Sequence, residues 1–159
     1  MNIHKDKLKP GKSLSVGESR QEEGGLHTIG YFKKSYKEKP LISIITVVLN
    51  GEQYLDRTIQ SIINQTYDNL EYIIIDGGST DKTVDIIKKY NDRIDYWVCE
   101  KDNGLYDAMN KGIDIATGAW INFMNAGDEL YNYSVLMNLF NNQNYQEVEI
   151  IYGNHEIIY

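Results

Sequence analysis

The sequence has few of the residues on which disulfide-rich and zinc-binding proteins depend. Cys99 is the one cysteine, so no disulfide can form within the chain, and a reducing compartment fits. Its place in an apolar stretch favours an inert core residue over a nucleophile. The three histidines, His4, His27 and His155, share no ligand spacing and give no zinc site.

The chain also lacks long apolar runs and an excess of basic residues. No apolar run approaches the roughly 20 residues that a membrane-spanning helix needs, and nothing resembles a secretory signal. The formal net charge of -7 argues against a nucleic-acid partner, because sequence-independent binding to phosphate backbones needs a basic surface. We therefore expect a soluble, cytoplasmic chain, which would handle phosphates through a divalent metal and a few placed cations.

Two familiar phosphate-binding motifs are absent as well. The glycines that follow residues 70–76 lack the third, helix-packing glycine of a dinucleotide fingerprint, and no Gly-Lys-Ser/Thr loop occurs. A receiver-type signalling domain would need an acidic pair where this chain has Leu49, Asn50 and Gly51. Dehydrogenase, nucleoside-triphosphatase and receiver functions are therefore excluded.

The stretch from Tyr72 to Thr83 is the most informative one present. Its β-branched run without alternation is typical of a strand covered on both faces, and Ser79, Thr80 and Asp81 suit the start of a helix. Amides at a helix N-terminus attract anions, and glycines let a ligand approach the backbone, so the turn suggests nucleotide binding. The alternative is an ordinary structural turn in which Asp76 and Asp81 act only as caps. Judged from this turn by itself, we favour that alternative.

Strands and helices alternate along the chain, which has the length of one domain. Strands are predicted at about 41–49, 70–76, 96–99, 120–124 and 150–152, and helices at about 53–65, 80–90, 105–116 and 135–140. The predicted fold is α/β, with a mainly parallel sheet, helices on both of its faces and right-handed crossovers.

Residues 1–39 are polar and have no sustained period, so they are predicted to form an extension or loose arm before a domain at 40–159. This arm ends in a cluster of lysines and aromatic residues: Tyr31, Phe32, Lys33, Lys34, Tyr36, Lys37 and Lys39. We interpret the cluster as a solvated linker; the alternative is contact with an anionic membrane surface.

Polar side chains follow each predicted strand of the parallel sheet. They are Asn50 with Glu52, then Asp76, then Glu100 with Asp102, then Asn125 with Asp128. The carboxyl ends of parallel strands meet at one edge, where acids and amides can bind a base, a ribose and a divalent cation. The alternative is that loops are polar everywhere, which is serious for Glu52, Glu100 and Glu129.

Five ordered motifs carry a resemblance to a known family. They are PLISIITVVLNGE (40–52), SIINQTY (61–67), EYIIIDGGSTDKT (71–83), DNGLYDAMNKG (102–112) and GAWINFMNAGD (118–128). Together, over about residues 40–155, they closely resemble the family 2 inverting glycosyltransferases. The resemblance implies a GT-A fold, in which a Rossmann-like nucleotide-binding half precedes an acceptor-binding half, and transfer of a sugar from a nucleotide diphosphate to a hydroxyl.

The resemblance also implies roles for particular residues. Thr46, Val48 and Asn50 would line the nucleotide pocket, Asp76 would bond the base, with uracil preferred, and Gly77, Gly78 and Ser79 would form the turn against the nucleotide. Asp102, Gly104, Asp107, Asn110 and Lys111 would close over base, ribose and diphosphate. The alternative for Asp107 and Lys111 is a surface pair at i, i+4, worth only ~0.3 to 0.5 kcal/mol.

Asn125-Ala-Gly-Asp128 stands where the family has its acidic metal motif, and only Asp128 keeps a carboxylate. The resemblance implies that Asp128, with the donor's diphosphate oxygens, holds Mg²⁺ or Mn²⁺, and that Asn125 contacts the nucleotide sugar. The alternative is a turn that has lost its metal, in which Asp128 caps the following helix.

The family's catalytic base lies downstream of the metal motif, so we expect it beyond Tyr159, with the acceptor half missing here. The leading hypothesis is a UDP-sugar glycosyltransferase of polysaccharide or glycolipid assembly, with a saccharide or lipid-linked acceptor, at the inner face of the cell membrane. Its rival is a non-catalytic nucleotide-sugar-binding module that partners a complete transferase. A sugar nucleotidyltransferase would need a glycine-rich, basic signature after the first strand, which residues 50–53 do not supply.

Overall fold

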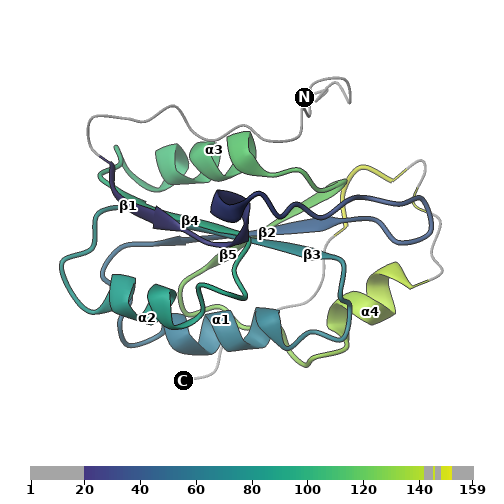
Figure 1. Cartoon of the computed structure of the whole chain (residues 1–159). Helices are drawn as coiled ribbons and strands as arrows, with labels where there is room; N and C mark the ends of the chain where they lie inside the picture. The colour runs from purple at the N-terminus through teal and green to yellow at the C-terminus, as the bar shows by residue number, and fades with distance from the viewer. Residues whose placement is uncertain (1–19, 142–144, 146–147, 152–159) are drawn as a thin grey trace.

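The computed structural model describes residues 20–141, 145 and 148–151. Its strands are β1 (Arg20–Gly24), β2 (Ile42–Val48), β3 (Leu70–Asp76), β4 (Tyr96–Glu100) and β5 (Trp120–Asn125). Its helices are the 3-10 turn η1 (Leu26–Ile29), α1 (Leu55–Ile63), α2 (Thr83–Lys89), α3 (Leu105–Ile115) and α4 (Val135–Phe140). The strands form one sheet in the order β1-β4-β3-β2-β5 (Figure 1).

The four strands β4, β3, β2 and β5 are parallel and end together at one edge of the sheet. β2 pairs with β3 from Ile42↔Leu70 to Val48↔Asp76 and with β5 up to Val47↔Asn125. The chain leaves β2 toward β3 and β4 on one side and then crosses to β5 on the other. The carboxyl end of β2 is therefore a topological switch point, where open α/β sheets bind ligands.

Helices cover both faces of the sheet, as predicted: α3 lies on one face, and α1, α2 and α4 lie on the other (Figure 1). The face toward α1 and α2 packs Ile44, Ile74 and Ile87 into the larger apolar cluster, and the α3 face packs Ile45 and Ile73. Every residue of β2, β3 and β4 is buried, which explains their apolar runs without alternation.

The prediction of a loose arm is wrong for residues 20–29. β1 pairs antiparallel with β4, from Arg20↔Glu100 to Gly24↔Trp97. The 3-10 turn η1 is tied to the start of β4, since Leu26 N donates to Ile94 O at 3.0 Å. The sequence RQEEG of β1 has no strand period. The strand forms because the edge of β4 supplies partners for its backbone hydrogen bonds. Residues 1–19 lie outside the described part.

Two other boundaries differ from the predictions. The helix expected from residue 80 begins at Thr83, because residues 77–82 form the loop after β3. Ile150 and Ile151 are not in a strand, and Tyr152, the end of the predicted last strand, lies outside the described residues. Of the helices in the described part, none has the length and apolar character needed to cross a membrane.

Candidate functional site

The loop after β3 is held by the carboxylate of Asp76, which is buried. It accepts hydrogen bonds from Gly78 N at 3.2 Å, from Ser79 N at 3.0 Å and from the Ser79 hydroxyl. Gly78 has a φ of 88°, a backbone conformation that residues with a side chain rarely adopt. In this structure Asp76 therefore shapes the predicted nucleotide turn from beneath, and its contact with a base stays a prediction.

The loop after β2 is bonded to the loop after β3. Asn50, at φ 52°, donates its N–H to Ser79 Oγ at 2.7 Å and accepts from Thr80 N through its side-chain oxygen at 2.9 Å. Gly51 N donates to Thr83 Oγ1 at 2.8 Å. The sequence predicted that these two loops meet, and they form one interlocked surface.

Thr46 and Val48 lie below this surface rather than on it. Thr46 is 0% exposed, and its hydroxyl lies 3.1 Å from the hydroxyl of Tyr72 in the layer beneath. Val48 is 6% exposed and belongs to the apolar cluster of the α1 and α2 face. Both residues support the loops from within the core, and their role in lining a pocket stays a prediction.

The segment after β4 brings Asp102 to the same edge. A Cβ on Gly77 would clash with the Asp102 carboxylate, so the two loops are in close contact. Asp102 Oδ1 accepts from Gly104 N at 2.9 Å, which shapes the start of α3. Asp107 accepts from Asn103 N at 3.0 Å, and this bond lowers the pKa of Asp107, aided by Lys111.

Lys111 forms ion pairs with two carboxylates and not only the i, i+4 surface pair with Asp107. Its Nζ lies 2.8 Å from Glu100 Oε1 and 3.5 Å from Asp107 Oδ2, and the Glu100 side chain is only 8% exposed. Burial opposes the charge of Lys111, but the bond to Glu100 outweighs it and raises the pKa of Lys111. Lys111 therefore remains a fixed cation beside the β4 loop, while Asn110 and Gly104 are exposed.

The turn after β5 is closed by Asp128, whose Oδ2 accepts from Asn125 N at 2.9 Å. The idea that Asp128 caps the following helix is wrong, since α4 begins at Val135 after Ser134. No group of three or more histidine, cysteine or acidic side chains suited to a metal exists among the described residues. One exposed carboxylate and the Asn125 amide fit a divalent ion only if diphosphate oxygens supply most of its ligands.

The loops of all four parallel strands thus meet along the carboxyl edge of the sheet. The β5 loop joins the others because a Cβ on Gly51 would lie 3.4 Å from Ala126 Cβ, and because Gly127 N donates to Thr58 of α1 at 2.9 Å. The loops that contain the predicted residues therefore lie together at this edge. The structure places Asp76, Thr46 and Val48 beneath the surface.

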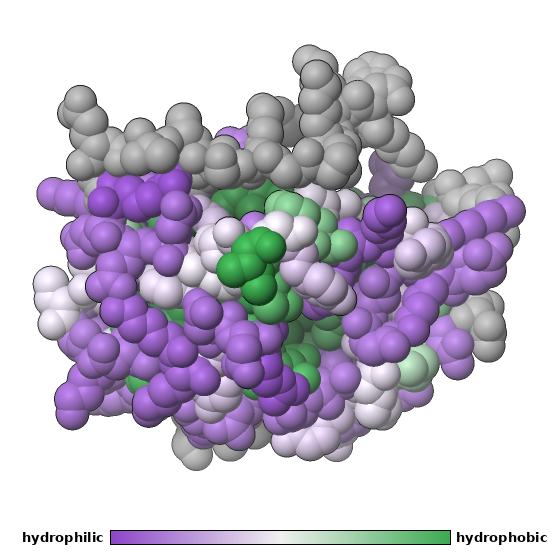
Figure 2. Space-filling model, in the orientation of Figure 1, coloured by the Kyte–Doolittle hydropathy of each residue, from purple (hydrophilic) through white to green (hydrophobic). Residues whose placement is uncertain are grey.

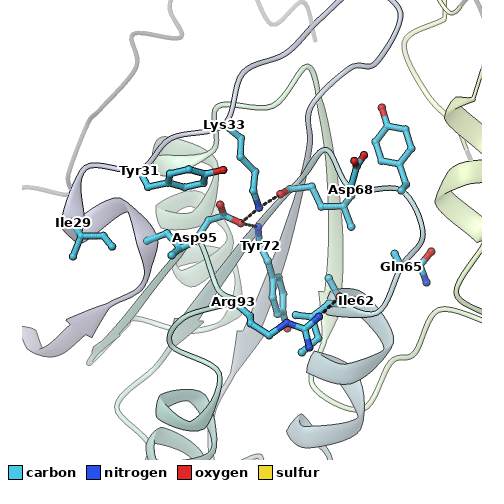
Figure 3. A pocket seen from close by; sticks show the side chains of 13 residues that line it. Ile29, Tyr31, Lys33, Ile62, Gln65, Asp68, Tyr72, Arg93 and Asp95 are labelled. Atoms are coloured by element: carbon cyan, nitrogen blue, oxygen red, sulfur yellow. Dashed lines mark hydrogen bonds and ion pairs between the residues drawn. The ribbon is translucent and has the colours of Figure 1, made fainter.

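A hollow of about 460 Å³ lies at the opposite, amino edge of the sheet (Figure 3). Leu70 and Asp95 line it at the starts of β3 and β4, and Tyr31 and Lys33 line it from the segment after η1. Lys33 Nζ donates to Asp95 Oδ2 at 2.9 Å and to Leu70 O, so the buried carboxylate is paired. Burial raises the pKa of Asp95, and the charge of Lys33 opposes this.

Sequence reasoning missed this hollow, because its N-terminal wall comes from residues interpreted as a linker. Figure 2 shows a hydrophobic patch over η1, where Ile29 is 78% exposed, within a mainly hydrophilic surface. None of the predicted donor-site residues lines the hollow. The hollow and the carboxyl edge are therefore separate regions of the molecule.

Curated relatives of the chain are glycosyltransferases. It is 40% identical over 100 residues to a protein of Mycobacterium bovis named PGL/p-HBAD biosynthesis glycosyltransferase, covering 61% of this chain and 39% of that protein. It is 36% identical over 121 residues to an uncharacterized glycosyltransferase of Rickettsia typhi, covering 75% and 37%. The chain thus spans about two fifths of the length of these relatives.

Solved structures share the fold. S. aureus TarS 1–349 in complex with UDP-GlcNAc matches with a TM-score of 0.57 and 23% identity over 62% of this chain and 30% of that one. The mannosyltransferase PcManGT from Pyrobaculum calidifontis, in complex with GDP-Man and Mn²⁺, matches with 0.58 and 21% over 72% and 35%. The predicted GT-A fold is confirmed.

The sequence profile described as "Glycosyl transferase family 2" matches residues 43–158, well over half of the chain. The matched region begins within β2 and contains the four loops of the carboxyl edge, whereas β1 and η1 precede it. The chain belongs to glycosyl transferase family 2.

Proposed function

We propose that the chain binds a nucleotide-diphosphate sugar at its carboxyl edge and serves in the transfer of that sugar to an acceptor hydroxyl. The observation that carries the proposal is the interlocking of the β2 and β3 loops at the switch point of a family 2 sheet. A UDP-sugar is the proposed donor. The proposed acceptor is a saccharide or lipid-linked hydroxyl in polysaccharide or glycolipid assembly.

The proposed reaction is a displacement at the anomeric carbon of the donor sugar. The bond from this carbon to a diphosphate oxygen breaks, the acceptor oxygen forms the new bond, and a base takes the acceptor's proton. Asn50, the glycine turn at Gly77 and Gly78, and Ser79 would hold base and ribose. Lys111, which stays protonated, would face the negative charge that develops on the departing diphosphate. No described residue is assigned as the base.

We propose Asp128, with Asn125 beside it, as the protein's share of a Mg²⁺ or Mn²⁺ site. Asp128 is exposed at the same edge, which leaves room for a shared ion. When bound, such an ion would neutralise charge on the diphosphate. With a single carboxylate, the ion should bind weakly without nucleotide.

Calorimetric titration with UDP-glucose, UDP-GlcNAc and GDP-mannose, each with Mn²⁺ and with EDTA, tests the proposal. We expect binding of at least one UDP-sugar, weakened at least about tenfold by Asp76→Asn, because the turn depends on that carboxylate. Asp114→Asn, an exposed change on α3, is the matched control and should bind as the wild type does. A folded wild-type chain that binds none of the three donors would contradict the proposal.

The second candidate is a non-catalytic module that binds a nucleotide sugar for a partner transferase. The observation that favours it is the single carboxylate, Asp128, in the motif at residues 125–128. Release of UDP in the presence of acceptor sugars, followed by mass spectrometry, separates the two candidates. Donor binding without any turnover would support the module.

We also propose that the segment from η1 to Lys39, called the strap below, contacts an anionic membrane surface. Ile29, Tyr31 and Tyr36 are each more than half exposed on it, and Lys34 and Lys37 are exposed beside them. Aromatic rings next to lysines suit the interface of a bilayer, where apolar bodies and positive charges are both stabilised.

A further inference from the structure

The start of β1 lies beside the carboxyl end of β4, although β1 precedes the region matched by the family. Its register on β4 runs from Arg20↔Glu100 to Glu22↔Cys99, so Gln21 is an extra residue in the pairing. Such a bulge bends a strand and re-aims the side chain of the extra residue. Bulges of this kind are common next to binding sites.

The Gln21 carboxamide points at the turn after β3. Its Oε1 lies 3.6 Å from Cys99 Sγ, and a Cβ on Gly78 would lie 3.8 Å from its Nε2. Burial, aided by a hydrogen bond to the Asp76 carboxylate, raises the pKa of Cys99 to about 12, so this residue remains a thiol between Asp76 and Gln21. The Nε2 group is therefore the part of the carboxamide that lies nearest to Gly78.

In the turn beside Gln21, the Asp102 carboxylate lies against Gly77, whereas Gly78 faces Lys101 and Gln21. The Asp76 carboxylate is buried and already accepts from Gly78 and Ser79. Gly78 has no side chain, and on its Cβ side it packs against the backbone of Lys101, whose Cα would lie 3.5 Å from a Cβ there. Within the described chain, Nε2 of Gln21 makes no hydrogen bond, so its two N–H donors are free for a ligand.

We infer that Gln21 is a base-contacting residue of the donor site, and that β1 forms a wall of that site. This inference rests on the proposed function. The glycine turn would receive the face of the nucleobase, and Gln21 would donate an N–H to a carbonyl oxygen of a pyrimidine such as uracil. The N-terminal strand would thus add a specificity contact to the loops of the parallel strands.

The experiment measures binding of UDP and of inorganic pyrophosphate in Mn²⁺ to the full chain and to Gln21→Ala. We expect the affinity for UDP to fall about two- to tenfold, as for the loss of one neutral hydrogen bond, with pyrophosphate binding unchanged. Gln21→Glu should weaken UDP binding at least as much, because it replaces the donor by a negative charge. Glu22→Ala is the matched control, since Glu22 follows on the same strand and pairs with Lys88.

The outcomes distinguish a failure of the role inferred for Gln21 from a failure of the proposed function. Equal UDP affinity for wild type and Gln21→Ala, or equal losses for UDP and pyrophosphate, overturns the role of Gln21. A folded wild-type chain, checked by circular dichroism, that binds pyrophosphate and GDP but not UDP overturns the pyrimidine assignment. A folded wild-type chain that binds no nucleotide at all overturns the proposed function instead.

Discussion

At the scale of single residues, His27 is expected to make the free energy of unfolding depend on pH. Its side chain is 7% exposed, its ring lies 4.5 Å from Phe32 and 6.2 Å from Tyr96 between centroids, and its Nε2 lies 3.5 Å from Glu71 Oε1. Burial lowers the pKa of His27 below 6.5, although the nearby carboxylates of Glu71 and Asp95 oppose this and Lys33 assists it. The folded chain therefore resists a proton that the unfolded chain accepts.

The sign of the resulting pH dependence follows from linkage. Below the unfolded pKa of 6.5 the unfolded state binds more protons, so the free energy of unfolding falls as the pH falls. We expect His27→Phe, which keeps a ring between Phe32 and Tyr96, to lose less stability between about pH 7.5 and about pH 5.5 than the wild type does. Urea unfolding at both pH values measures this. Equal losses in the two proteins would show that His27 does not titrate as inferred.

At the scale of elements, α3 lies close to the sheet because Gly112 faces β2. A Cβ at Gly112 would clash with Ile45, which is 0% exposed and cannot move into solvent. Overpacking of this kind costs about 1 to 3 kcal/mol, whereas alanine gains roughly 1 kcal/mol in helix propensity. Gly112 therefore sets the distance between α3 and β2.

We expect Gly112→Ala to lower the free energy of unfolding by up to about 2 kcal/mol, because the cost of the clash exceeds the propensity gain. Denaturant unfolding measures the change. Asp114→Ala, on the exposed side of the same helix, is the matched control and should change stability by less than about 0.5 kcal/mol. A Gly112→Ala chain at least as stable as the wild type would mean that α3 shifts freely.

Elements whose own residues carry a hydrophobic pattern were predictable from the sequence, and elements defined by their pairing partners were not. The run at 70–76 gave β3 to the residue, because burial on both faces leaves its mark on every side chain. β1 was not predictable, since its pairing depends on the edge of β4 and not on RQEEG. The gathering of Asn50, Asp102 and Asp128 at one edge followed from parallel pairing. The burial of Asp76 did not, because it depends on the fold of its own loop.

At the scale of the whole molecule, charge is distributed unevenly. The chain carries a net charge of -7, yet residues 33–39 contain four lysines and one acid. The strap is tied to the amino ends of the strands, since Lys33 bonds to Leu70 O and Asp95, whereas the loops proposed to bind the donor lie at the carboxyl ends. A strand of seven residues, such as β2, is about 23 Å long at roughly 3.3 Å per residue. A chain docked through its strap would therefore hold the donor site away from the bilayer.

This arrangement predicts a local, salt-sensitive attraction to anionic vesicles in spite of the acidic total. We expect Lys34→Glu to weaken binding to phosphatidylglycerol vesicles roughly fivefold or more, because each lysine near such a surface contributes about 1 kcal/mol. Lys89→Glu, on exposed α2 surface, makes the same change in net charge and should have little effect if the strap is the contact. Cosedimentation at low and physiological salt measures both variants. Equal losses would mean that total charge governs the attraction. If the wild type does not bind the vesicles either, the proposed membrane contact of the strap is wrong.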